Sequence, residues 1–178
     1  RGYLNGHTYE SYNNGSTMYQ LAFAANNNTI KNLDVQDLAT SNSNQYMLNF
    51  NNKGTVVDFV INNYDDGNHP FHLHGHKFYV LAIGNAGYFS EDYYNEDSDV
   101  LNFKNPVLRD TVNIPGYGWG VLRFVIDSPG VWPFHCHIGW HIESGLMMQI
   151  NSLQSEYSEW DNYPQQWYDH CQYWQDQL

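Results

Sequence analysis

Basic side chains are scarce in this sequence. Its 178 residues include only seven Lys and Arg against 19 Asp and Glu, which leaves a formal net charge of -12. Because nucleic acids and anionic membranes are polyanions, a chain of this charge is poorly suited to binding either of them. The low Lys content and the abundance of Asn, Tyr and Ser instead fit a secreted protein.

Long apolar runs are also absent. No stretch approaches the roughly 20 apolar residues that a membrane-spanning helix needs, and no signal peptide is visible. The chain starts with Arg1, which we interpret as the start of a mature or cut polypeptide. Glycosylation sequons stand at Asn14 and Asn27, although such sequons also arise by chance in an Asn-rich chain. We therefore predict a secreted, extracellular protein without a membrane segment.

Cysteine is rare, with two residues and no Cys-x-x-Cys pair. A structural zinc site uses four ligands, usually with paired cysteines, so this spacing disfavours zinc. Cys136 lies within a histidine cluster, which leaves Cys171 without an obvious partner. An odd cysteine in a secreted chain predicts a bridge to something outside it, and the alternative is a free buried thiol.

Short apolar segments separated by turn residues predict an all-β fold. Residues 55–62 are β-branched and almost entirely apolar, as in a central strand. Further strands are expected at 78–83, 107–114, 119–126, 131–134 and 145–150, with a long acidic loop at 84–104. Strands at this spacing indicate a Greek-key β-sandwich or barrel, and without a visible linker residues 1–178 are predicted to form a single domain.

The C-terminal residues 155–178 follow a different pattern. After Pro164, apolar side chains recur every three to four residues, which predicts a short helix with Pro in its first turn. The apolar face comprises Tyr163, Trp167, Cys171 or His170, Trp174 and Leu178. We expect this aromatic face to lie against another surface.

Histidine, by contrast, is concentrated. Seven of the nine histidines and one of the two cysteines lie in two clusters, residues 69–76 and 135–141. Because neighbouring side chains in a strand point to opposite faces, His135 and His137 share one face and Cys136 takes the other. His72 and His74 share a face for the same reason. Two places are therefore predicted, one with these four imidazoles and one with Cys136, His69 and His141.

Two His and one Cys thiolate are the ligands of a blue-copper electron-transfer site. A cysteine among histidines could instead be a catalytic nucleophile, but that chemistry leaves five or six clustered histidines without a role. Core histidines satisfied by hydrogen bonds are the ordinary alternative for any single His, and here they would have to account for seven.

The two clusters resemble the paired copper signatures of the multicopper oxidases, a family that includes laccases, ascorbate oxidases and ferroxidases. The signatures are His-Pro-Phe-His-Leu-His-Gly-His at 69–76 and His-Cys-His-x-x-x-His-x-x-x-Gly-Leu at 135–146. The stretches Arg-Asp-Thr-Val at 109–112 and Asp-Ser-Pro-Gly-Val-Trp at 127–132 are also similar. The resemblance covers residues 55–150 best and matches the last of the family's three cupredoxin domains.

The resemblance implies a copper ligand at each of seven positions. The type 1 copper, which takes electrons from the substrate, is matched by His69, Cys136 and His141. A type 2 ligand is matched by His72, and the type 3 pair by His74, His135 and His137. In the family these last three coppers form the trinuclear cluster that reduces dioxygen to water. His76 belongs to the motif but matches no ligand, so we interpret it as structural.

Two positions qualify this match. Leu146 stands where some members have an axial Met, and a missing axial ligand favours Cu(I) and raises the potential. Gly139 stands where the family often has an acid associated with proton supply, which puts that proton route in doubt.

The chain also supplies only half of the histidines of the family's trinuclear cluster. The rest come from the family's first domain, so the implied partners are the N-terminal cupredoxin domains of the same oxidase, as a separate chain or a missing segment. In laccase-like relatives a tail cysteine bridges to the first domain, which implies that role for Cys171.

The predicted activity is therefore laccase-like. Phenols or aromatic amines would lose single electrons through His141, His69 and Cys136, and dioxygen would be reduced to water at the cluster. A ferroxidase is the alternative, because Asp65 matches an acid that helps bind ferrous iron in yeast-type ferroxidases; we favour a turn role for Asp65, given the turn formers at 63–67. A pure electron-transfer cupredoxin would not need the other four histidines, and a copper-storage domain would show no turnover.

Overall fold

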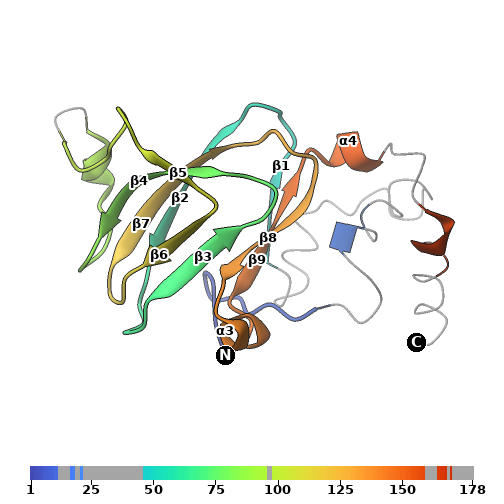
Figure 1. The fold of residues 1–178 in the computed structure, drawn as a ribbon, viewed down its shortest axis with the longest axis horizontal. Coiled ribbons are helices and arrows are strands. Elements are labelled where there is room, and N and C mark those ends of the chain that lie inside the picture. Colours follow the sequence, from blue (N-terminus) through green and yellow to red (C-terminus); the bar gives the residue numbers. More distant parts are fainter. Residues whose placement is uncertain are drawn as a thin grey trace.

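The computed structural model describes residues 1–11, 17–18, 21, 46–95, 98–158, 164–167 and 169. Within these residues the chain forms two β-sheets that pack face to face (Figure 1). The five-stranded sheet has the order β1-β9-β8-β3-β6 and the four-stranded sheet the order β2-β7-β4-β5. The prediction of an all-β sandwich is confirmed.

The strands are short and mostly antiparallel. The five-stranded sheet comprises β1 (Met47–Phe50), β9 (Met147–Ser152), β8 (Gly130–Cys136), β3 (His69–Leu73) and β6 (Thr111–Ile114). The four-stranded sheet comprises β2 (Val56–Asn62), β7 (Trp119–Val125), β4 (Phe78–Gly84) and β5 (Val107–Arg109). The helices whose bounds lie within the described residues are η1 (Glu91–Tyr94), α3 (Gly139–Glu143) and α4 (Gln154–Ser158).

The prediction of one strand across residues 107–114 is wrong. The segment divides at Asp110: β5 pairs with β4 in one sheet, and β6 pairs with β3 in the other. The Asp110 carbonyl leaves the ladder of β5 and accepts a hydrogen bond from Leu73 N at 3.0 Å. Both halves have strand-forming sequences, so only the choice of pairing partner reveals the crossover.

Aromatic side chains fill the space between the sheets near the histidine clusters. Phe71 stacks on Phe134 with ring centroids 5.0 Å apart, and Phe59 meets Phe134 edge-on at 5.2 Å. Cys136 belongs to the same buried cluster and is 0% exposed. One metal-binding candidate therefore lies at the end of the hydrophobic core, on elements that close packing holds in place.

A charged cluster ties the long 84–104 loop to the outer face of the four-stranded sheet. Arg123 donates two hydrogen bonds to the Asp58 carboxylate, both at 2.7 Å, and Tyr94 donates a third at 2.8 Å. Burial opposes ionisation of Asp58, but the hydrogen bonds from Arg123 and Tyr94 outweigh it and hold the pKa of this carboxyl below its usual value. Burial and the bond to Asp58 raise the pKa of Tyr94 to about 12.

We expect Asp58→Ala to lower the free energy of unfolding by about 2 kcal/mol, because hydrogen bonds to charged groups contribute about 1.5–3 kcal/mol each and Arg123 would lose its partner. Lys53→Ala is the control, since it removes the 3.6 Å ion pair with Glu156 in which both side chains are exposed. That loss should stay within about 0.5 kcal/mol. Chemical denaturation measures both, and equal effects would contradict a specific role for the Asp58 cluster.

The C-terminal region is described only in part. Residues 165–167 and 169 are helical, and Trp167 is 44% exposed. The other members of the predicted apolar face (Tyr163, His170, Cys171, Trp174 and Leu178) lie outside the described residues, as do Asn14 and Asn27. The tail contact, the disulfide, glycosylation and secretion thus stay predictions. Among the described residues no helix is long and apolar enough to cross a bilayer.

Candidate metal centre

Two adjacent strands bring the distant histidine clusters together. β3 and β8 are antiparallel neighbours, with Phe71 opposite Cys136 and His72 opposite His135. Residues that stand opposite each other in a strand pair point to the same face of the sheet. The imidazoles of His72 and His135 therefore share one face, and the thiol of Cys136 points to the other. Helix α3 follows β8 directly and returns His141 towards the thiol.

The first group is a compact three-donor site. Cys136 Sγ lies 3.5 Å from His69 Nδ1 and 3.4 Å from His141 Nδ1. The three ligand atoms all lie within 4.8 Å of one another. An ion about 2.0–2.3 Å from each nitrogen and sulfur donor would separate N from S by roughly 3.5 Å. The donor set and its spacing therefore fit a trigonal His2Cys metal site.

A carboxylate orients one of these imidazoles. Asp65 Oδ2 lies 3.0 Å from His69 Nε2, so Nε2–H donates to it and the Nδ1 lone pair faces Cys136. The hydrogen bond with His69, followed by that from Asp66, holds the pKa of the Asp65 carboxyl below its usual value. The Asp65 side chain is 57% exposed, whereas His69 is buried.

The thiol is enclosed on its other sides. Burial raises the pKa of the Cys136 thiol, so without a metal it stays protonated and a bound cation would displace its proton. Leu146 O accepts a hydrogen bond from Cys136 N at 3.1 Å, and Leu146 N donates to His141 O at 2.9 Å. The backbone of Leu146, the residue at the position of the axial Met in some family members, is thus hydrogen-bonded to the backbones of Cys136 and His141. Leu146 also lines the same pocket as His69 and His141.

The second group contains four imidazoles on the opposite face. The ring centroids of His72 lie 4.7 Å from those of His74 and 5.6 Å from those of both His135 and His137. His74 Nε2 and His135 Nε2 are 3.0 Å apart, a separation at which both nitrogens could bind one ion. Among the described residues, no second set of three ligand atoms is as compact as the His2Cys site. The four imidazoles therefore make an open, partial site.

Main-chain oxygens fix the orientation of two of these rings. His72 Nδ1 donates to Asp110 O at 2.8 Å and lies 2.9 Å from Thr111 Oγ1, and His135 Nδ1 donates to Cys136 O at 3.0 Å. In both rings Nε2 is left to bind a metal. The sequence motif at 109–112 contained this anchor, although the pattern alone did not reveal its role.

Burial favours the neutral form of His74 and His135. It lowers the pKa of His74 and of His135, and the neighbouring imidazoles lower both further. Metal ions bind the neutral form of histidine, so protons compete less for these two ligands.

Two further positions were singled out by the sequence. His76 is buried, its Nδ1 lies 3.3 Å from His74 O, and its Nε2 has no hydrogen-bond partner among the described residues. It packs edge-on against Phe124 and Trp132, away from the three-donor site. Gly139 begins α3, and a Cβ there would meet nothing within 4 Å. An acidic side chain would fit at that position, so packing does not require the glycine.

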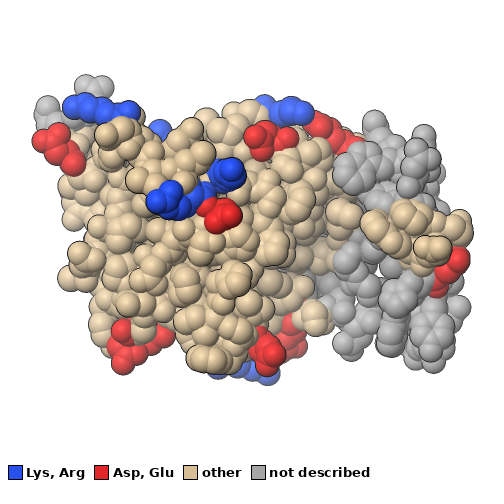
Figure 2. All heavy atoms as spheres, in the orientation of Figure 1, with Lys and Arg blue, Asp and Glu red and all other residues tan. Residues whose placement is uncertain are grey.

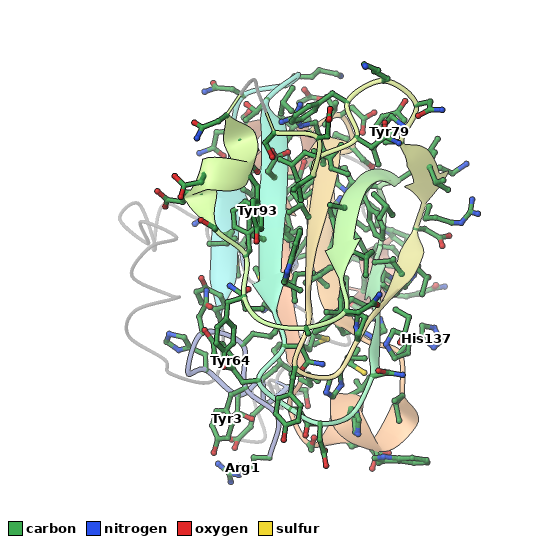
Figure 3. The ribbon with its side chains drawn as sticks, turned by 90° about the vertical axis from the view of Figure 1, so that its left-hand side faces the viewer. Arg1, Tyr3, Tyr64, Tyr79, Tyr93 and His137 are labelled. Atoms are coloured by element: carbon green, nitrogen blue, oxygen red, sulfur yellow. The ribbon has the colours of Figure 1, made fainter. Side chains whose placement is uncertain are left out.

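Both groups lie at one end of the sandwich, on different sides. Figure 3 shows Arg1, Tyr3 and Tyr64 together at the lower end in that view, with His137 on the other side. A pocket of about 520 Å³ contains the first three of these residues and reaches Asp65, His69 and His141. A separate pocket of about 580 Å³ runs from His72 and His74 past Tyr79, Leu108 and Val125. Each candidate site thus opens to its own surface.

Comparison with known proteins gives a consistent result. The family model described as multicopper oxidase matches residues 11–156. An iron transport multicopper oxidase of Schizosaccharomyces pombe is 47% identical over 107 residues, which are 59% of this chain and 16% of the relative. An L-ascorbate oxidase of Cucumis sativus is 46% identical over 101 residues, which are 53% of this chain and 16% of the relative.

A solved structure has a similar fold. The crystal structure of Fet3p, a multicopper oxidase that functions in iron import, superposes with a TM-score of 0.72 at 26% identity and covers 96% of this chain. This chain covers 32% of that structure, and 16% of each of the two relatives above. It therefore corresponds to one part of longer proteins.

Proposed function

Because this chain belongs to the multicopper oxidase family, we propose that it is the C-terminal copper-binding domain of such an oxidase. Members of this family use type 1, type 2 and type 3 copper. We also propose that ferrous iron is the preferred reducing substrate. The observation that carries the choice of substrate is the exposed Asp65 carboxylate on His69. Copper held by His69, Cys136 and His141 would supply one-electron oxidation of the substrate. Copper held by the four imidazoles together with a further domain would supply reduction of dioxygen.

Seven side chains are proposed to hold the metals. The type 1 ligands are His69, Cys136 and His141, a type 2 ligand is His72, and the type 3 ligands are His74, His135 and His137. The His2Cys spacing supports the first assignment, and the Nε2–Nε2 distance of 3.0 Å between His74 and His135 supports the last.

The backbone offers a short route between the two sites. Cys136 is bonded directly to His135 and His137, whose rings lie 5.5 Å apart on the other face of the strand end. In addition, His135 Nδ1 donates to Cys136 O at 3.0 Å. An electron received through Cys136 can therefore reach either histidine through covalent bonds alone.

Asp65 is suited to a cationic substrate. Its Oδ1 accepts a hydrogen bond from Asp66 N at 2.8 Å, as a turn residue does, while its Oδ2 accepts from His69. The Asp65 side chain can therefore stabilise the turn and bind a substrate cation at the same time. Like any ordinary Asp it is ionised at neutral pH. Because Asp65 contacts His69 and His69 contacts Cys136, a ferrous ion at this carboxylate would be one imidazole away from the Cys136 sulfur.

Phenols are the second candidate substrate, because the same pocket contains Tyr3 and Tyr64. Tyr64 also meets Tyr88 with ring centroids 5.0 Å apart, which provides an exposed aromatic surface. A flat aromatic donor could stack there within reach of His141.

A further domain is proposed to cover the four imidazoles. The pocket beside His72 and His74 is lined by the exposed apolar side chains of Tyr79, Leu108 and Val125. Figure 2 shows basic and acidic side chains together near the middle of the face in view, with most other charged side chains towards its rims. Exposed apolar area of this kind favours burial against a partner.

The substrate proposal is tested with Asp65→Asn in the complete oxidase. We expect kcat/KM for ferrous iron to fall by about tenfold or more, equivalent to about 1.4 kcal/mol, because the negative charge beside His69 is lost. The rate with a neutral phenol should change much less. Steady-state kinetics with both substrates measures the difference.

Asp66→Asn is the matched control, because it removes the same charge one residue away from the hydrogen bond to His69. It should leave iron oxidation close to wild type. Equal losses for iron and phenol in Asp65→Asn, or an equal loss of iron oxidation in the Asp66 variant, would refute a specific role for Asp65 in ferrous oxidation.

A further inference from the structure

An N-terminal hairpin lies beside the three-donor site. Leu4 and His7 exchange two backbone hydrogen bonds, each of 2.9 Å, across a two-residue turn. Asn5 and Gly6 both have positive φ angles, 49° and 82°, as in the type I′ turns that close tight hairpins. Residues 2–9 thus form a compact hairpin, here called the N-terminal clasp.

Both arms of the clasp bind the loop that follows His141. Gly2 N donates to Ser144 O at 2.8 Å, and the Thr8 hydroxyl donates to the same oxygen at 3.2 Å. Tyr9 N donates to Gly145 O at 3.0 Å. Three hydrogen bonds therefore hold the two carbonyls that immediately precede Leu146.

The clasp is itself anchored to the sandwich. The His7 ring stacks on Tyr46 with centroids 4.8 Å apart and planes within 4°, and the Asn5 side-chain amide donates to the Tyr46 hydroxyl at 3.0 Å. Tyr46 O in turn accepts from Gln149 N of β9 at 2.9 Å. The hairpin therefore connects the loop to the sheet that carries Cys136.

Contact between the clasp and Leu146 is tight. A Cβ on Gly2 would lie 2.6 Å from Leu146 Cβ and 2.9 Å from Leu146 N, so only glycine allows this approach. Gly145 has a φ of 98°, and a Cβ there would lie against the Thr8 hydroxyl. Leu146 is bonded on its other side to Cys136 N and His141 O. It is thus held between the clasp and two of the three donors.

We propose that the N-terminal clasp positions Leu146 over the His2Cys site and thereby sets the reduction potential of the metal bound there. A fixed apolar side chain at this place would keep water away from a metal held by the three donors, and the apolar surroundings of the Cys sulfur tune the potential of a blue-copper site. Gly2 and Thr8 are positioning residues in this arrangement, since they act through Leu146. The inference rests on the proposed assignment of His69, Cys136 and His141 as type 1 copper ligands.

The test uses Gly2→Ala and Thr8→Val in the complete, copper-loaded oxidase. Gly2→Ala forces Leu146 and the clasp apart, and Thr8→Val removes a hydrogen bond with little change of volume. Both should admit water towards the metal and stabilise its oxidised form. We expect the ratio of oxidised to reduced type 1 copper at a fixed potential to rise, by about tenfold for Gly2→Ala. For a one-electron couple this corresponds to a reduction potential that is lower by about 59 mV.

Three controls separate positioning from general damage. Thr8→Ser keeps the hydroxyl and should restore the wild-type potential. Thr55→Val removes a similar bond, from the Thr55 hydroxyl to Asn52 O at 2.7 Å, away from the site and should leave the potential unchanged. Leu146→Met supplies a sulfur ligand and should lower the potential, which shows that the titration detects an axial change.

Optical redox titration and electron paramagnetic resonance decide the outcome. Lowered potentials in Gly2→Ala and Thr8→Val, with Thr8→Ser and the type 2 copper signal unchanged, support the proposal. If Gly2→Ala does not load copper, the Thr8 pair decides. Wild-type potentials in both clasp variants, with Leu146→Met lowered, would overturn it. If the wild type has no blue thiolate-to-copper absorption, the type 1 assignment itself is wrong, so the two failures are distinguishable.

Discussion

In the complete oxidase, Cys136→Ser should abolish the blue absorption, and turnover with any reducing substrate should fall to background. The serine oxygen occupies nearly the same volume but does not ionise at neutral pH, so it replaces neither the thiolate ligand nor its charge-transfer absorption. His69 and His141 would be left as two donors of a site built for three. The same substitution also changes the atom through which electrons would pass to His135 and His137.

Copper analysis and visible spectroscopy measure this result. The four-imidazole group should retain its copper, because none of its side chains contacts the thiol. A variant that keeps the blue absorption would contradict the assignment of Cys136. A variant that loses all copper, with an unfolded circular dichroism spectrum, would show that the thiol is required for folding, because Cys136 is wholly buried in the core.

The converse result is expected for His135→Ala. His135 lies opposite His72 in the strand pair, and its Nε2 is 3.0 Å from that of His74. Its loss should remove a ligand from the four-imidazole group, which is proposed to reduce oxygen, while leaving the blue absorption in place. Loss of a residue that only supports a ligand costs about 10–100-fold in affinity or activity, so loss of a ligand should slow reoxidation by more than that.

Stopped-flow measurement of the blue absorption tests this expectation. Substrate should bleach the colour without oxygen, and oxygen should fail to restore it. The matched control is His76→Phe, which alters a histidine of the same motif that packs against Phe124 and Trp132. It should reoxidise like the wild type. If both variants reoxidise normally, the proposed role of the four imidazoles is wrong.

Much of the site follows from local patterns. Strand alternation alone divides the residues around Cys136 into two faces, because successive side chains of a strand point in opposite directions. The structure shows these faces, with the thiol towards His69 and His141 and the imidazoles of His135 and His137 on the other side. Periodicity also located most strands, since burial of one face leaves a regular apolar pattern.

Other features have no local signature. The division of 107–114 at Asp110 depends on which strands pair, and both halves are equally strand-like. The residues around Asp65 indicate a turn residue, and only its contact with His69 indicates a second role. The clasp depends on a close approach between Gly2 and Leu146, which are remote in the chain.

The amino-acid sequence is enough to predict an acidic β-sandwich with seven candidate metal ligands in two short motifs, which strand alternation places on two faces. The distances between these side chains come from the packing of the strands. This packing places β3 beside β8 in the register that sets the thiol between His69 and His141, and it leaves the four imidazoles as an open group. Alternation is a property of a single strand, whereas register, crossovers and close contacts arise from packing between segments far apart in the chain.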